Sequence, residues 1–280
     1  MQSHLQTDDD NTMNSEFDYA RYWGLRALPF DNVPDPRFYV PCLQHDAAHR
    51  WLSYGIQTGK GMLLLTGDVG CGKTLLSRRL IAGLSPIRYD VALAANPALS
   101  PSELLDEVLS QFGLGLVRSK AGRLQTLNAR LELNAQRGIS SVLVVDEAQT
   151  IESVKGFEDL RLLTNFQLTD RFMLTVVLIG QPKLRHRVAG IPQLNQRIAL
   201  RAHLGPFTTE ETTSYITARM GAATDRIDVF TKEAIAVIYA QSKGIGRLIH
   251  ALCDQCLFAG AIEHVLQIDD RLVQRVGQIM

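Results

Sequence analysis

Eight consecutive residues, 67–74, read Gly-Asp-Val-Gly-Cys-Gly-Lys-Thr. The glycines allow a tight turn in which successive backbone N–H groups converge on phosphate oxygens. Lys73 supplies a positive charge for the β- and γ-phosphates, and Thr74 supplies a hydroxyl ligand for Mg²⁺. The apolar run 62–65 predicts a buried strand before this motif, and a helix follows it. This pattern predicts a P-loop that binds ATP and Mg²⁺ through Gly67, Asp68, Val69, Gly70, Cys71, Gly72, Lys73, Thr74 and Leu75.

An acidic pair follows a second apolar run, residues 141–145. Downstream of a P-loop, this strand end predicts the other half of an ATPase site. Asp146 is then a metal ligand together with Thr74, and Glu147 orients and deprotonates the attacking water. Gln181 follows the next apolar run and is expected to contact the γ-phosphate, with a simple turn residue before proline as the alternative. We therefore expect hydrolysis of ATP and water to ADP and phosphate.

Five predicted strands alternate with helices, at 62–65, 87–93, 141–145, 173–179 and 198–204. Such an alternation favours a parallel α/β sheet covered by helices on both faces. After residue 205 the pattern is helical only, with capping boxes at 100–103 and 208–211 marking helix starts. The expected organisation is a disordered tail at 1–16, a linker and helix packing on the core at 17–60, an ATPase domain at 61–204 and a helical lid at 205–280.

Composition excludes several classes of protein. Lysine plus arginine and aspartate plus glutamate both number 29, so the formal charge is zero and gives no global footprint for nucleic acid. No apolar run approaches the roughly 18 residues of a membrane-spanning helix, and the polar N-terminus lacks the features of a secretory signal. The four cysteines make no disulfide framework, which favours a reducing, cytoplasmic location.

Six strings resemble the ExeA/GspA family of AAA+ ATPases: PFDNVPDPRFYV, LLLTGDVGCGKTLLSRRL, VLVVDEAQ, LRLLTNFQLTDRFMLTVVLIGQPKL, NQRIALRAHL and GIGRLIHALCD. The resemblance runs from about Gly24 to the C-terminus. This family includes pilus-associated, MshM-like members and is related to the TnsC and MuB transposition ATPases. It implies a P-loop NTPase sheet followed by a small all-α lid.

The resemblance also implies roles for three polar residues. It makes Gln181 the sensor 1 residue and Arg247 the sensor 2 residue, which reaches from the lid to the γ-phosphate. Arg197 matches the place of an arginine finger for the neighbouring subunit's ATP, with Arg201 as the second choice. The chain is then expected to form a homo-oligomer, as a ring or a helical filament. Gly246 stands where relatives often have proline, and this difference loosens the start of the lid helix that carries Arg247.

Three biological tasks remain open from the sequence. The first is an assembly motor in secretion or pilus biogenesis, with a protein partner of that machinery. The second is a TnsC/MuB-like regulator of transposition that forms ATP-dependent oligomers on duplex DNA. The third is an ATP-gated switch or scaffold. Many ExeA/GspA members continue into a transmembrane helix and a peptidoglycan-binding domain, which this sequence lacks, and this departure weighs against membrane work in secretion.

Weaker patterns each carry two interpretations. The aromatic segment 17–41 either walls an adenine pocket or forms a structural strap, and it is too irregular for a helix. His45 and His49, and likewise Cys253 and Cys256, have metal-ligand spacing, but ordinary helix faces are favoured because no third ligand is evident. A basic stretch either is a solvated helix face or lines a channel for a phosphate backbone in an assembly. Its members are Arg118, Lys120, Arg123, Arg130 and Arg137.

Overall fold

The computed structural model describes residues 18–31, 40, 42–95, 97–169, 171–226 and 228–279. The chain forms two compact units. One is Pro41–Gly205, which we call the ATPase unit, and the other combines Met1–Val40 with Pro206–Met280, which we call the helical unit. The predicted tail at 1–16 lies outside the described residues, as do Phe38 and Tyr39 of the aromatic segment.

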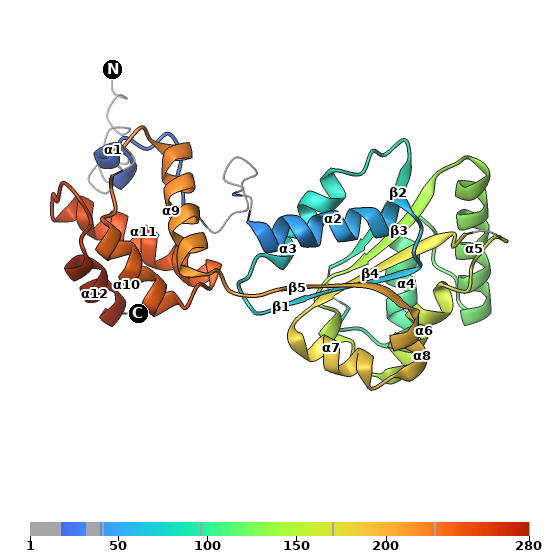
Figure 1. The fold of residues 1–280 in the computed structure, drawn as a ribbon. Helices are drawn as coiled ribbons and strands as arrows, with labels where there is room; N and C mark the ends of the chain where they lie inside the picture. Colours follow the sequence, from blue (N-terminus) through green and yellow to red (C-terminus); the bar gives the residue numbers. More distant parts are fainter. Residues whose placement is uncertain are drawn as a thin grey trace, which may run out of the picture. The chain divides into compact units, whose positions relative to one another are not determined.

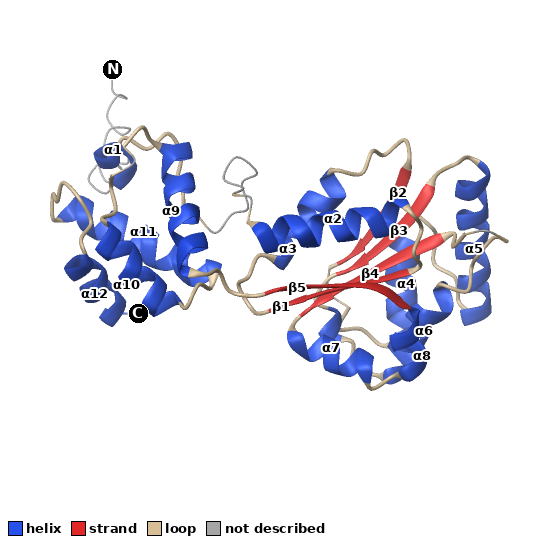
Figure 2. Cartoon of the chain, in the orientation of Figure 1, coloured by secondary structure: helices blue, strands red, loops and turns tan. Residues whose placement is uncertain are grey.

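The ATPase unit is built on a five-stranded parallel sheet with the order β2-β3-β4-β1-β5 (Figures 1 and 2). Each strand begins and ends within two residues of its predicted range. Parallel pairing brings the carboxyl ends of all five strands to one edge of the sheet, where α/β proteins of this kind bind ligands. The strands are β1 Met62–Gly67, β2 Tyr89–Ala94, β3 Ser140–Val145, β4 Leu174–Gly180 and β5 Ile198–Leu204.

Helices cover both faces of this sheet (Figure 1). Met62 and Leu64 of β1 pack in one buried cluster, against α4 to α8, whereas Leu63 and Leu65 pack in the other, against α2 and α3. This alternation is what a strand buried on both faces requires, and it explains the continuous apolar run in the sequence. The helices are α2 Leu43–Gln57, α3 Lys73–Ala82, α4 Pro101–Gln111, α5 Lys120–Gln136, α6 Val154–Leu163, α7 Pro182–Ala189 and α8 Pro192–Arg197.

The described part of the helical unit contains α1 and four C-terminal helices, and no named strand. The predicted capping boxes are confirmed. The side chains of Ser100 and Thr208 accept a hydrogen bond from the backbone N–H three residues on, and the side chains of Glu103 and Glu211 accept one from the backbone N–H of Ser100 and Thr208. Among the described residues, none of the helices is both long and apolar enough to cross a bilayer. The helices of the unit are α1 Tyr19–Trp23, α9 Thr209–Ala223, α10 Lys232–Ser242, α11 Gly246–Ile262 and α12 Asp270–Ile279.

The N-terminal aromatic segment differs from expectation in two ways. It contains a short helix, α1, because Asp18 caps its first turn and Gly24 ends it in the left-handed conformation at φ 64°. It also packs within the helical unit and not as one piece with α2: the indole N–H of Trp23 donates to the carbonyl of Leu257 at 2.8 Å. Trp23 and Phe30 are 0% and 1% exposed there, which favours the structural-strap interpretation for both residues.

Candidate active site

The P-loop connects β1 to α3, as the sequence predicts. Gly70 and Gly72 adopt φ values of 83° and 85°, a region that favours glycine, so the turn depends on these residue types. The Lys73 ammonium is only 6% exposed and donates to the carbonyl oxygens of Gly67 and Asp68, both at 2.9 Å. These bonds hold a positive charge inside the loop, where the β- and γ-phosphates of a nucleotide would lie.

A histidine that the sequence did not single out for this role supports the turn. His45, on α2, lies with its Nε2 2.9 Å from the carbonyl oxygen of Cys71. A Cβ atom at Gly72 would come within 3.1 Å of the same nitrogen, so glycine there gives the imidazole room. Burial raises the pKa of the Cys71 thiol, which keeps it in its unreactive neutral form.

Asp146 and Glu147 follow β3 directly, and Asp146 faces the P-loop. The Thr74 hydroxyl lies 3.4 Å from Asp146 Oδ2, so the two predicted metal ligands are neighbours. Oxygen ligands of this kind fit Mg²⁺, which keeps several waters and takes only one or two protein ligands. Burial raises the pKa of Asp146 above its ordinary value, and the N–H of Glu147, at 2.8 Å from Oδ1, opposes that rise.

Gln181 lies one residue beyond β4, and β4 pairs with β1 up to Thr66 and Gly180. The register therefore brings Gln181 to the same sheet edge as the P-loop. Its backbone N–H donates to Oε1 of Gln149 at 3.0 Å. Gln149 was not predicted as a site residue, although it stands two positions after Glu147 in the Asp-Glu-Ala-Gln string.

The remaining predicted site residues are arginines. Arg197 ends α8 at the amino end of β5, where its guanidinium donates to Asn165 Oδ1 at 3.1 Å. Arg201 is held by Asn195, through its carbonyl at 2.9 Å and its side-chain oxygen at 2.8 Å. Arg247 is exposed near the start of α11, in the helical unit. The structure therefore brings together the P-loop, Asp146, Glu147 and Gln181, and it places Arg197 at the opposite edge of the sheet.

The described residues contain no group of three or more His, Cys, Asp and Glu side chains arranged to hold a metal ion. Cys253 and Cys256 are fully buried on α11, and burial raises the pKa of both thiols. These observations favour the interpretation of both cysteines as small core residues.

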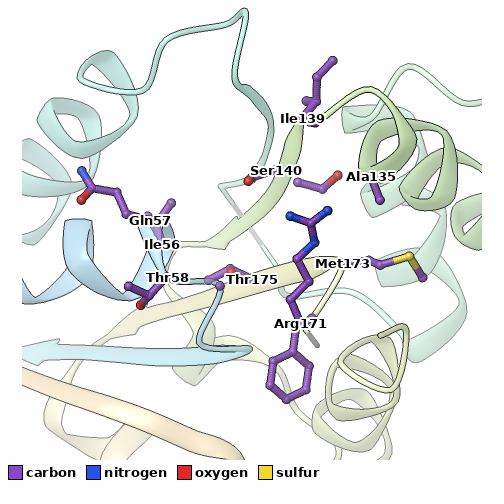
Figure 3. Close-up of a pocket in the computed structure, with 13 residues that line it drawn as sticks. Ile56, Gln57, Thr58, Ala135, Ile139, Ser140, Arg171, Met173 and Thr175 are labelled. Atoms are coloured by element: carbon purple, nitrogen blue, oxygen red, sulfur yellow. The ribbon is translucent and has the colours of Figure 1, made fainter. Parts of the chain in front are cut away.

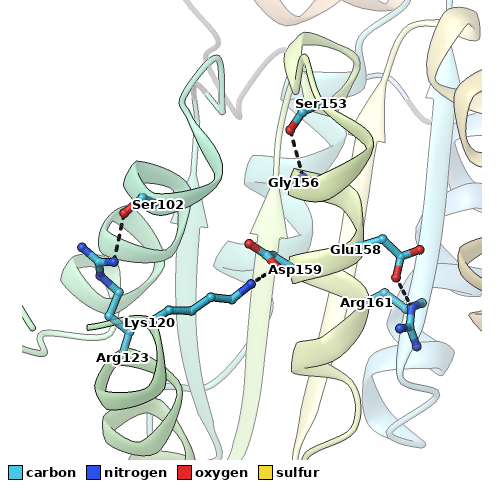
Figure 4. Close-up of polar contacts among 8 residues, drawn as sticks. All are labelled: Ser102, Lys120, Arg123, Ser153, Gly156, Glu158, Asp159 and Arg161. Carbon is cyan, nitrogen blue, oxygen red and sulfur yellow. Dashed lines mark hydrogen bonds and ion pairs between the residues drawn. The ribbon is translucent and has the colours of Figure 1, made fainter. Parts of the chain in front are cut away.

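Much of the basic stretch is neutralised within the chain. Lys120 forms an ion pair with the buried Asp159 (Figure 4), and Arg123 forms a two-pronged pair with Asp106. Arg130 likewise donates to Asp90 at 2.9 Å. These pairs tie α5 to α4, α6 and β2, which weighs against the channel interpretation for three of the five basic residues.

A cavity of about 150 Å³ opens at the other edge of the sheet (Figure 3). It is lined by the amino ends of β3 and β4, including Ser140 and Thr175, with the Arg171 side chain reaching into it. Because the P-loop, Asp146 and Gln181 lie at the carboxyl ends, this cavity is separate from the candidate nucleotide site.

The parallel sheet, the glycine turn between β1 and α3, and the Asp-Glu end of β3 define a P-loop nucleotide-binding protein of the AAA+ class. Residues 56–188 match the family model described as AAA domain. Among solved structures, the fold is similar to those of the following three proteins, among others. Each is 18% identical to this chain, so the likeness concerns the fold alone. They are Aeropyrum pernix ORC2 (TM-score 0.66, 89% of this chain and 71% of that chain), Drosophila ORC bound to DNA (0.69, 99% and 68%) and the Thermotoga maritima RuvB Holliday junction branch migration motor (0.56, 84% and 69%).

The chain is 37% identical over 246 residues to General secretion pathway protein A of Aeromonas hydrophila. The match takes in 86% of this chain and 44% of that protein, so the chain spans less than half the length of this relative. The chain is therefore an ExeA/GspA-like AAA+ protein, which confirms the resemblance carried by its motifs.

Proposed function

We propose that the chain hydrolyses Mg-ATP and uses this reaction to drive or regulate a macromolecular assembly in secretion or pilus biogenesis. The observation that carries the proposal is the meeting of Thr74 and Asp146 across 3.4 Å, beside a buried Lys73 and directly before Glu147. A hydroxyl and a carboxylate at this spacing suit a magnesium ion that neutralises the phosphate oxygens. Similarity to a general secretion pathway protein supports the biological setting.

Each residue has a defined part in the proposed reaction. Lys73 holds the β- and γ-phosphates, and Thr74 and Asp146 hold the magnesium. Glu147 takes a proton from water, whose oxygen forms a bond to the γ-phosphorus while the bond to the β–γ bridging oxygen breaks and ADP leaves. Gln181 and Arg247 contact the γ-phosphate. These roles supply positioning and charge stabilisation, which account for most of the catalysis in phosphoryl transfer.

Arg197 is proposed to act on the ATP of the neighbouring subunit. It precedes Ile198, which pairs with Met62 at the amino end of β1, whereas the P-loop begins at the carboxyl end of that strand. At about 3.3 Å for each residue, the six residues of β1 separate the two by about 20 Å. An arginine so far from its own P-loop is available only to a second copy of the chain, so we propose a homo-oligomer with sites at subunit interfaces.

Two substitutions test the chemistry. Glu147→Gln should bind ATP and assemble but turn over at least about 100-fold more slowly, since it loses the base. Lys73→Ala should lose nucleotide binding itself. We would measure binding with a fluorescent ATP analogue and turnover by phosphate release. Wild-type turnover in Glu147→Gln would rule out this residue as the base.

Electron microscopy with a non-hydrolysable ATP analogue, with and without duplex DNA, tests the assembly. Closed rings formed without DNA support the secretion or pilus role. Filaments that need DNA, together with salt-sensitive stimulation of turnover by DNA, would instead support a TnsC/MuB-like regulator. The ion pairs of Lys120, Arg123 and Arg130 weigh against the DNA alternative, because these side chains are already neutralised.

A further inference from the structure

Gln149 lies on a short 3₁₀ turn, Ala148–Thr150, and is only 9% exposed. Both ends of its amide are hydrogen-bonded to candidate site residues. The amide N–H₂ donates to Glu147 Oε2, and the amide oxygen accepts the backbone N–H of Gln181 at 3.0 Å. One buried side chain therefore connects the proposed base to the end of the strand that carries the proposed γ-phosphate sensor.

The surroundings hold this amide in place. Arg187, on α7, donates to the carbonyl oxygens of Gln149 at 2.8 Å and Glu152 at 2.7 Å, and its guanidinium lies 4.9 Å from the centre of the Phe157 ring. Gly180 leaves the room that the amide occupies, because a Cβ atom there would fall 2.3 Å from Gln149 Oε1. Contacts from the 3₁₀ turn, α7 and the end of β4 thus hold the side chain of Gln149 in one position.

The geometry of Glu147 makes this support consequential. Glu147 has a φ of 50°, a left-handed conformation that costs a non-glycine residue about 1 kcal/mol or more. Its backbone is fixed by the Thr150 hydroxyl, which donates to its carbonyl oxygen at 2.8 Å. The side chain is fixed by Gln149 on one oxygen, Oε2.

We propose that Gln149 is a positioning residue that aims the Glu147 carboxylate and couples it to the main chain at Gln181. This inference rests on the proposed ATPase function and deepens it. When a γ-phosphate contacts the end of β4, a shift of the Gln181 backbone changes the position of the amide oxygen of Gln149. The amide N–H₂ group moves with it, and so does the carboxylate that it holds. Binding of a γ-phosphate thereby changes the orientation of the Glu147 carboxylate.

Two variants separate this role from simple packing. Gln149→Leu removes both hydrogen bonds at similar size, and Gln149→Glu keeps the shape and the acceptor for Gln181 but replaces the donor with a carboxylate. Each should lower kcat by about 10–100-fold, in the range typical of residues that orient a catalytic group. The Kd for ATP should stay within about twofold, because the amide of Gln149 bonds to the Glu147 side chain and to the Gln181 backbone, and not to the P-loop that is proposed to hold the phosphates. Gln125→Leu, at an exposed position of α5, is the matched control and should behave as wild type.

A double-mutant cycle decides the mechanism. If Gln149 acts through Glu147, adding Gln149→Leu to Glu147→Gln should cause no further loss of kcat. An equal loss in both backgrounds, or kcat within about twofold of wild type for both Gln149 variants, would overturn the proposal. If Gln149→Leu fails to fold, Gln149→Glu carries the same cycle. Wild-type turnover in Glu147→Gln alone, or failure of the wild type to bind ATP, would instead refute the proposed function.

Discussion

Replacing Asp146 with asparagine should raise the thermal stability of the ligand-free protein and reduce the stabilisation that Mg-ATP gives. The side chain is 7% exposed, and burial raises the pKa of Asp146 above its ordinary value of 3.8. An amide oxygen at the same position still accepts the N–H of Glu147. Asp146→Asn therefore removes a desolvated charge at neutral pH without leaving that N–H unpaired, and the ligand-free protein should become more stable.

The size and sign of this gain follow from linkage. Because the pKa of the folded state lies above the unfolded value, the unfolded chain releases its proton first as the pH rises. The folded state therefore loses stability between the two pKa values, at about 1.4 kcal/mol for each unit that separates them. Each kcal/mol corresponds to about 2–4 °C in Tm for domains of 150–250 residues. The advantage of the variant should be full above the folded-state pKa and should vanish as the pH falls toward 3.8.

Mg-ATP should stabilise the variant less than it stabilises the wild type. A ligand at 100 times its Kd stabilises the folded state by about 2.7 kcal/mol, and a tenfold loss of affinity in the variant removes about 1.4 kcal/mol of that. Calorimetry of each protein with and without Mg-ATP gives both values. Asp225→Asn, whose side chain is 95% exposed, makes the same chemical change and should leave both values unaltered. A lower Tm of ligand-free Asp146→Asn at pH 7, or an undiminished shift with Mg-ATP, would refute the reasoning.

Three further predictions follow from the site and the helical unit. Burial and the guanidinium of Arg219 lower the pKa of His250 to about 4, so between pH 6.5 and 4 only the unfolded chain binds this proton. The free energy of unfolding should therefore fall by about 3 kcal/mol over this range. In denaturant titrations, His250→Gln should lack this dependence of stability on pH. Trp23→Ala should destabilise the protein by about 3–5 kcal/mol, measured by denaturant titration at neutral pH. Arg197→Ala and Lys73→Ala should each be inactive alone, but an equal mixture should regain about a quarter of wild-type turnover. In random assembly, about one interface in four has an intact Lys73 on one subunit and an intact Arg197 on its neighbour. No recovery in the mixture would contradict action in trans.

The sheet and the core of the site were predictable because they depend on local patterns. β5 spans the predicted range, Ile198–Leu204, and the P-loop and the Asp-Glu pair lie where their flanking apolar runs place them. Helix starts with a capping box were also predictable, since the box involves residues three apart. These features are set by periodicity and by contacts within a few residues of the chain.

The parts that escaped prediction depend on contacts between distant residues. Gln149 reaches Gln181 across 32 positions, and only the absence of a Cβ at Gly180 makes room for it. His45 contacts the carbonyl oxygen of Cys71, 26 residues away in the P-loop turn. In the sequence, its spacing to His49 indicates only a helix face or a metal ligand. The charges of α5 similarly find their partners on other elements, so the sequence showed the charges but not their pairing.

The topology of the sheet argues for a site that one chain cannot complete. Parallel strands collect the P-loop, Asp146, Glu147 and Gln181 at their carboxyl ends, while the connection from α8 into β5 leaves Arg197 at the amino ends. Lys73 is buried at the carboxyl edge, where it would neutralise part of a triphosphate, with Mg²⁺ and the proposed Arg247 contact adding positive charge. Arg197 of the same chain lies at the opposite edge, so we propose that a second copy of the chain supplies this arginine to the transferring phosphoryl group. ATP turnover would then depend on contact between subunits, and a protein that regulates a larger assembly requires this dependence.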